Sequence, residues 1–127
     1  LGRATRYARE RNVFDRPIGQ NQGIQHPLAE RWMYLEAAWL MAMRAAELYD
    51  TSQPCGAEAN SAKFLGARAG HDAAWQAIMT HGGFGYAKEY HVERLFREVA
   101  INRIAPITEQ LILSFIAEKV LDLPKSY

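Results

Sequence analysis

The residues best suited to hold a ligand form the stretch Thr-His-Gly-Gly-Phe-Gly-Tyr at positions 80–86. Three glycines in four positions do not suit a helix interior, where each costs about 1 kcal/mol relative to alanine. They suit a sharp turn at which the backbone comes close to another group. Arg94 and Arg97 follow on the next helical segment, so free N–H groups and arginines together could bind an anionic or planar ligand. The alternative is a plain helix C-cap, where glycine is the commonest residue.

Five arginines gather near the start of the chain, at positions 3, 6, 9, 11 and 16. Most of them are interpreted as the solvated face of a helix. Arg11 differs because it lies where the helical pattern ends, three residues before Phe14. At such a junction its planar guanidinium can leave the helix surface and bind a phosphate group.

Other kinds of reactive site have little support in the sequence. No histidines have the helical spacing of metal ligands and the His-Glu-x-x-His motif is absent, so we predict no metal site. Cys55 is the only cysteine, which excludes an internal disulfide, and it is not predicted to be a nucleophile. The serines lack a hydrolase elbow, and neither a P-loop nor a complete Gly-x-Gly-x-x-Gly fingerprint occurs.

The spacing of apolar residues predicts an all-α protein, and no alternating pattern is long enough to predict a strand. We expect helices over residues 1–12, 26–50, 57–81, 92–104 and 109–121, with Pro106 ending the fourth and Thr108 capping the fifth. Long helices with short links favour an up-and-down antiparallel four-helix-type bundle. With 127 residues, 49% of them hydrophobic, the chain is expected to form a single domain over residues 1–127.

Two of the expected helices carry patterns that concern packing. The helix at 26–50 has Pro27 in its first turn, where no N–H donor is needed. One apolar line along it consists of Leu28, Trp32, Leu35, Trp39, Ala42, Ala46 and Tyr49. The helix at 57–81 has small residues at positions 62, 66, 70, 73 and 77, which permit close approach of another helix and are interpreted as ordinary packing.

The last predicted helix is apolar over most of its circumference, because its polar residues at 110, 114, 118 and 122 form one narrow stripe. Such a helix is buried on more than one side. In so small a domain we expect the second side to contact another subunit, and the alternative is a missing part of the same chain. The chain opens at Leu1, with no initiator Met and directly in a helical pattern, which indicates a piece of a longer protein.

Charge and hydropathy limit the partners that the chain is expected to have. The net charge is only +1, so the sequence gives no reason to expect nucleic acid binding. No apolar run approaches the length of a membrane span, and no signal peptide is visible, so we predict no membrane partner. The expected location is cytoplasmic.

Two motifs, taken together, resemble the C-terminal domain of the acyl-CoA dehydrogenase family. The first is Arg11 followed by Phe14, by Pro-Ile at 17–18 and by Gln22, eight residues after Phe14. The second is Gly-Gly-Phe-Gly-Tyr at 82–86, followed by Glu-Arg at 93–94 and Arg-Glu at 97–98. It is similar to the family's Gly-Gly-x-Gly-Tyr turn and its Arg-Asp pair. The resemblance covers the whole chain in order and at consistent spacing.

The resemblance implies an all-helical domain of an FAD-dependent oxidoreductase of fatty acid metabolism. In that family an acyl-CoA thioester is oxidised to its trans-2-enoyl form. A carboxylate removes the α proton while the β hydrogen leaves as hydride to the flavin. The domain is implied to complete the FAD site of a neighbouring subunit in a homodimer or homotetramer, and to have no activity alone.

The resemblance also implies which residues bind FAD. Arg11 would contact the pyrophosphate of the partner subunit's FAD, Phe14 would pack beside the cofactor, and Gln22 would bind its adenosine side. Thr108 and Gln110 match the family's last FAD-contacting segment. The adenine end would be lined, mostly by backbone, by Met79, Thr80, His81, Gly82 and Gly83.

The chain departs from the family pattern in three places. Asp15 replaces the glycine after the aromatic residue, and Asp tolerates left-handed backbone better than most residues. Met79 stands where a glutamine is common. Pro106 stands where the family often has its catalytic glutamate, and proline cannot take a proton.

No catalytic residue is therefore expected within the chain. Some family members keep the base on the helix that begins this domain, at a position that would fall before Leu1, and we expect the base there. Glu109 is the acidic residue nearest to Pro106, where the family often has its catalytic glutamate. Glu109 is expected at the surface or in a cap at the helix start.

The loss of the glutamate leaves an alternative function open. The chain could be a helical oligomerisation module of a flavin monooxygenase, of an acyl-CoA oxidase-like protein or of a catalytically dead relative. The determinants of acyl chain length and branching would lie mostly upstream, and this sequence does not specify the electron acceptor.

Overall fold

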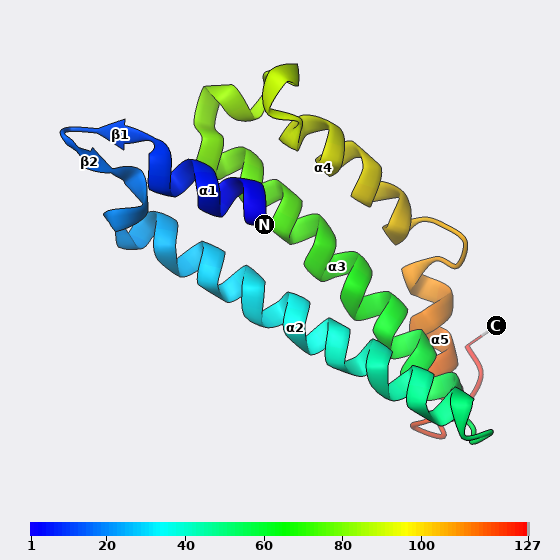
Figure 1. The fold of residues 1–127 in the computed structure, drawn as a ribbon. Helices are drawn as coiled ribbons and strands as arrows, with labels where there is room; N and C mark the ends of the chain where they lie inside the picture. Colours follow the sequence, from blue (N-terminus) through cyan, green and yellow to red (C-terminus); the bar gives the residue numbers. More distant parts are fainter. Residues whose placement is uncertain (127) are drawn as a thin grey trace.

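The computed structural model describes residues 1–126, so Tyr127, the last residue of the predicted domain, lies outside it. Two long helices, α2 (Gln22–Asp50) and α3 (Gly56–His81), form an antiparallel hairpin. Figure 1 shows them side by side along the length of the molecule. α3 is the central element, because α1, α2, α4 and α5 all pack against it.

The chain starts with α1 (Gly2–Glu10), which lies against α3 near the His81 end. A small antiparallel hairpin of two strands, β1 (Asn12–Val13) and β2 (Arg16–Pro17), follows and projects from that end of the molecule (Figure 1). Its register places Asn12 opposite Pro17. The 3-10 helix η1 (Ile18–Gln20) then leads into α2.

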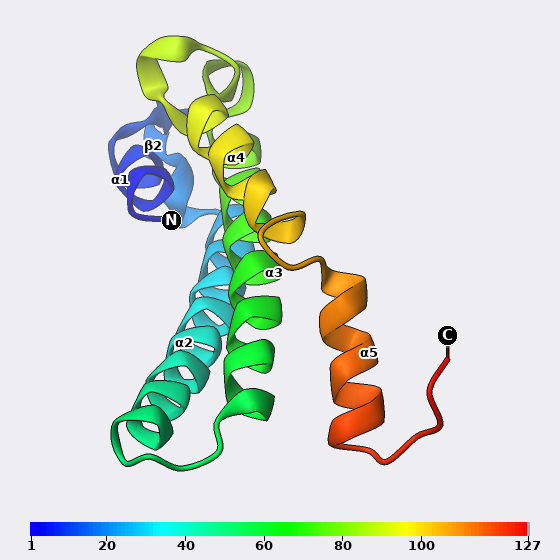
Figure 2. The same cartoon turned by 90° about the vertical axis from the view of Figure 1, so that its right-hand side faces the viewer.

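After α3, two short 3-10 helices, η2 (Gly82–Gly85) and η3 (Lys88–Tyr90), reverse the chain into α4 (Val92–Ala100). A further 3-10 helix, η4 (Ile101–Arg103), and an irregular stretch lead to α5 (Glu109–Lys119). Figure 2 shows α4 and α5 following one another along the same side of α3. The predictions of an all-α fold and a four-helix-type bundle are confirmed.

Alanine fills most of the buried apolar positions. They are Ala4, Ala8, Ala38, Ala67, Ala69, Ala73, Ala74 and Ala77, together with Leu28, Leu48, Val92 and Ile112. The predicted line of small residues on α3 lies partly in this core, since Ala73 and Ala77 are buried. Small side chains let several helices approach α3 closely.

α2 begins four residues earlier than predicted. The Asn21 carbonyl already accepts hydrogen bonds from the N–H groups of Ile24 and Gln25, so the helix starts at Gln22. Pro27 consequently lies in the second turn rather than the first.

The predicted apolar line of α2 is divided between two sides of the helix. Leu28 is buried, but the Trp32, Trp39 and Tyr49 residues are 55%, 60% and 75% exposed. Ala38 and Leu48 are the other buried residues of α2. α2 therefore carries apolar residues both toward α3 and toward solvent, which a single periodic pattern cannot separate.

The ends of other elements also differ from the prediction. The fourth helix ends at Ala100 and continues as η4, and α5 ends at Lys119. The hairpin at 12–17 was not expected, because strands of two residues are too short to show alternation. Within residues 1–126, none of the helices combines the length and apolarity needed to cross a membrane.

The close approach of Gly85 to α3 generates a stability prediction. In Gly85→Ala the new Cβ would lie 2.5 Å from the Ile78 carbonyl oxygen, so backbone must shift. Overpacking of this kind costs about 1–3 kcal/mol. We expect a lower melting temperature in the full-length protein. Gly66→Ala is the control, because its Cβ would also meet nothing within 4 Å and it lies outside the glycine turn, and equal melting temperatures for the two variants would contradict the predicted clash.

Candidate functional site

Arg11 is fixed by backbone hydrogen bonds at the junction between α1 and the β hairpin. Its N–H donates to the Tyr7 carbonyl, and its own carbonyl accepts from the Ile18 N–H, each at 2.8 Å. The side chain is exposed, with its guanidinium carbon 5.8 Å from the centre of the Phe84 ring. Among residues 1–126 no carboxylate forms a salt bridge with it, so its charge is available to a ligand.

The turn of the β hairpin presents Phe14 to solvent. Phe14 and Asp15 have φ values of +53° and +59°, and two positive values are typical of a type I′ turn. Asp15 thus forms the turn without a glycine. A left-handed conformation is rare for a bulky residue and costs roughly 1–2 kcal/mol. The Phe14 residue is nevertheless 93% exposed, and strained, exposed residues of this kind are candidates for a binding role.

The glycine turn leaves backbone open at the end of α3. Gly82 has φ +58° and ψ −132°, a conformation that favours glycine. A Cβ added at Gly82 or Gly83 would meet no atom within 4 Å. A ligand can therefore approach the backbone of these two residues more closely than it could approach residues with side chains.

The two residues before the glycines turn their side chains inward. The Thr80 hydroxyl donates a 2.8 Å hydrogen bond to the Gln76 carbonyl, and His81 Nδ1 donates one of 2.7 Å to the Ala77 carbonyl. Both residues are buried. The His81 ring stacks on Tyr7, with the ring centres 4.2 Å apart. These side chains support the turn, so any contribution of the two residues to a ligand would come mainly from their backbone.

Arg11, Phe84 and the glycine turn at the end of α3 surround one open hollow of about 430 Å³. It is lined by Tyr7, Arg11, Val13, Ile18, Met79, Thr80, His81, Gly82, Gly83 and Phe84. The hollow combines an arginine, an aromatic ring and a stretch of uncovered backbone. This combination suits an anionic ligand that carries a planar ring.

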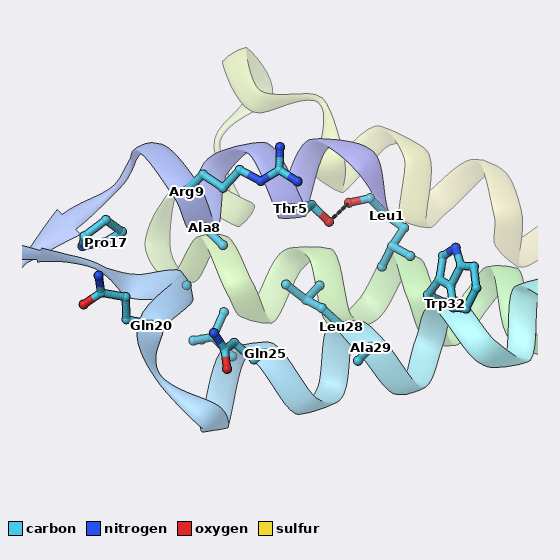
Figure 3. A pocket seen from close by; sticks show the side chains of 12 residues that line it. Leu1, Thr5, Ala8, Arg9, Pro17, Gln20, Gln25, Leu28, Ala29 and Trp32 are labelled. Carbon is cyan, nitrogen blue, oxygen red and sulfur yellow. Dashed lines mark hydrogen bonds between the residues drawn. The ribbon is translucent and has the colours of Figure 1, made fainter.

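A larger hollow of about 590 Å³ lies between α1 and α2 (Figure 3). Its lining is mainly apolar, with Ala8 on α1 and Leu28 and Trp32 on α2, and with Arg9 at its edge. None of the predicted site residues lines it. Within residues 1–126 no cluster of His, Cys, Asp and Glu could hold a metal ion.

Thr108 and Gln110 lie in a different part of the molecule. Thr108 caps α5, its hydroxyl oxygen accepting from the Leu111 N–H at 3.4 Å, and Gln110 is exposed. The residue between them, Glu109, contacts Arg68, which precedes His81 by 13 residues on α3. That separation is roughly 20 Å along the helix axis. The structure therefore does not bring Thr108 and Gln110 into the hollow.

Glu109 is buried, and the expectation of a surface position or simple cap was wrong. Its Oε1 accepts a 2.6 Å hydrogen bond from Arg103 Nε, while its Oε2 accepts from the terminal nitrogens of Arg103 and Arg68, each at 3.1 Å. Arg68 Nε lies 3.3 Å from the same oxygen. The guanidinium of Arg68 also lies 4.3 Å from the centre of the Phe64 ring.

These contacts make Glu109 a poor base. Hydrogen bonding to Arg103 lowers the pKa of the Glu109 carboxyl to about 2, and Arg68 acts in the same direction against the opposing effect of burial. Hydrogen bonding to Glu109 raises the pKa of Arg103 in turn. A carboxylate with so low a pKa has little tendency to take a proton near pH 7. Pro106, three residues before it, has no group that could do so.

The structure collects six of the ten predicted residues in the hollow: Arg11, Met79, Thr80, His81, Gly82 and Gly83. Phe14 occupies the hairpin tip beyond it, and Gln22 is the exposed first residue of α2, outside the lining. Phe84, which belongs to the predicted glycine motif, also lines the hollow, although it was not among the residues expected to bind FAD. Sequence reasoning missed Arg68 and Arg103, which no motif connects to Glu109.

The family model for "Acyl-CoA dehydrogenase, C-terminal domain" matches residues 1–121. The acyl-CoA dehydrogenase FadE12 of Mycobacterium tuberculosis is 43% identical over the whole chain. The chain spans only 33% of that relative, about a third of its length.

Solved structures give the same fold at high similarity. Butyryl-CoA dehydrogenase from Megasphaera elsdenii superposes with a TM-score of 0.92 at 28% identity, over 94% of this chain and 31% of that one. An FAD complex of PigA superposes with a TM-score of 0.89 at 27% identity, over 92% of this chain and 30% of that one.

The low pKa of Glu109 generates a prediction about pH and stability. Between pH 4.5, the carboxyl's ordinary pKa, and about 2, the folded protein binds fewer protons at Glu109 than the unfolded chain. The stabilisation is therefore complete above about pH 4.5 and is lost as the pH falls toward 2. Glu109→Gln should lower the free energy of unfolding near pH 7, by about 1.5–3 kcal/mol for a hydrogen-bonded charge.

Urea unfolding of the full-length protein and of Glu109→Gln at several pH values measures this difference. It should shrink steadily below pH 4.5. Glu98→Gln, which removes a carboxylate from an exposed pair with Arg94, is the control and should have a small effect. A difference that stays constant down to pH 2.5 would refute the assignment.

Proposed function

Because this chain belongs to the acyl-CoA dehydrogenase family as its C-terminal domain, we propose that it forms the C-terminal part of an FAD-dependent acyl-CoA dehydrogenase. Such an enzyme would oxidise an acyl-CoA thioester between its α and β carbons. The observation that supports the proposal best is the hollow at the end of α3, where Arg11, Phe84 and the open backbone of Gly82 and Gly83 meet.

The chemistry of this hollow fits part of an FAD molecule. Arg11 supplies a fixed cation for the pyrophosphate, and the glycines allow the adenine end to approach the backbone beside Met79. Phe14 would pack against the cofactor from the hairpin tip, with Gln22 near the adenosine side. When bound, FAD would supply the hydride acceptor for the oxidation.

The cofactor at this hollow would belong to a neighbouring subunit. Phe14 is 93% exposed at the hairpin tip, and an exposed ring in a strained turn suits a contact with another molecule. α5 offers a surface for such an assembly, because Leu111 and Leu113 are 55% and 49% exposed. The assembly would be a homodimer or a homotetramer.

Thr108 and Gln110 would make a separate contact with the cofactor, about 20 Å along α3 from the hollow. The catalytic base would lie upstream of Leu1, because Pro106 carries no proton acceptor and Glu109 is held by two arginines. The role of this chain would be to bind FAD and to assemble subunits, while the substrate would meet its base elsewhere in the full-length protein.

The reaction can be tested with the full-length protein under anaerobic conditions. Addition of acyl-CoA thioesters of different chain lengths should bleach the absorbance of the oxidised flavin with at least one of them. A protein that carries flavin but is bleached by no acyl-CoA would contradict the proposed substrate class. A protein purified without flavin, and unable to take it up, would contradict the cofactor assignment.

The hollow itself can be tested by Arg11→Ala in the full-length protein. Loss of a charge-assisted contact with the pyrophosphate should cost roughly 1.5–3 kcal/mol, so FAD affinity should fall by about 10- to 150-fold. Arg9→Ala is the matched control, because Arg9 lies on α1 outside this hollow. The measurement is an FAD titration of the apoprotein, and wild-type affinity in Arg11→Ala would rule out the assigned contact.

A further inference from the structure

The Glu109 carboxylate ties together two elements that are distant in sequence. It accepts two hydrogen bonds from Arg103 in η4 and two from Arg68 in α3. Glu109 is the only buried carboxylate in residues 1–126. Arg68 is held in turn against Phe64, so the ion cluster formed by Arg68, Arg103 and Glu109 is anchored on the central helix.

The ion cluster links the two ends of the irregular stretch at residues 104–108. This stretch has no helix or strand, and the Ile104 and Ile107 residues in it are 64% and 46% exposed. The Arg103–Glu109 pair joins the residue before it to the residue after it through two parallel hydrogen bonds. A planar fork on a carboxylate restricts orientation as well as distance, so it limits the conformations of the stretch.

Stability alone does not explain this arrangement well. Other ion pairs of the chain, such as Arg94–Glu98 and Arg97–Glu93, are exposed pairs one helical turn apart that contribute little. A buried pair pays a desolvation cost, and apolar residues of similar volume often stabilise a protein equally well or better. A requirement for exact placement of the neighbouring residues explains why a charged, directional contact occupies this position.

We infer that Arg68, Arg103 and Glu109 are positioning residues, which hold the stretch 104–108 and the first turn of α5 so that Thr108 and Gln110 meet the cofactor. The inference rests on the proposed function, because it assigns a task to residues on either side of Glu109. Glu109 itself is buried and bonded to the two arginines, so its assigned role is to position its neighbours and not to bind the cofactor directly.

A double-mutant cycle in the full-length protein tests the inference. FAD is titrated into the apoproteins of the wild type, Glu109→Gln, Arg103→Met and the double variant, and flavin fluorescence gives each dissociation constant. Each single change should weaken FAD binding at least tenfold. The double variant should bind no more weakly than the worse single variant, because the two residues act as one unit.

Ile112→Ala separates positioning from general loss of stability. Ile112 is a buried residue of α5, and its truncation weakens the packing of that helix without removing a member of the ion cluster. At a temperature where every apoprotein is folded by circular dichroism, its FAD affinity should stay within about twofold of the wild type. Equal losses in Ile112→Ala and Glu109→Gln would overturn the inference.

Arg103→Lys keeps the charge but removes the planar fork, and it tests the inference if Glu109→Gln does not fold. Its FAD affinity should also fall, and wild-type affinity would overturn the positioning role. If Arg11→Ala loses FAD while Glu109→Gln and Arg103→Lys keep it, the proposed function stands and this inference fails. A wild-type protein that binds no FAD would overturn both.

Discussion

Close packing on α3 is the constraint on which the other elements depend. Its buried apolar positions are all alanine, so neighbouring helices lie against its backbone with little between them. α3 also connects the two regions assigned to the cofactor, because the glycine turn follows its last residue and Arg68 lies near its middle. A helix that moved away from α3 would therefore displace one of these regions relative to the other.

An alanine core leaves the large apolar side chains outside. Trp32, Trp39, Leu111 and Leu113 are each about half exposed or more, and full burial of a side chain of this size is worth about 1.5–3 kcal/mol. Several such residues on α2 and α5 form exposed apolar surface of the kind that is typical of protein–protein contacts. Much of the apolar content that indicated a core from composition thus lies outside the core of this chain.

The sequence predicted the order and type of the α-helices because their periodicity is long and their breaks contain proline or glycine. It also predicted six of the ten residues that line the hollow, since Arg11 and the glycines stand at the ends of helices, where backbone groups are left open. The sequence did not predict features that depend on contacts between residues far apart in the chain. Periodicity could not tell which apolar side of α2 faces α3, and no local signal shows that Glu109 meets Arg68, 41 residues earlier.

The left-handed backbone at Phe14 means that the residue that best suits folding differs from the residue present. Selection for folding alone favours glycine or asparagine, which adopt this conformation at low cost. The aromatic ring at this position is 93% exposed and gains almost nothing from packing within the chain. If Phe14 contacts a cofactor or subunit as proposed, a lineage that lost this contact would be free to replace Phe14, while the remainder of the hairpin stayed unchanged.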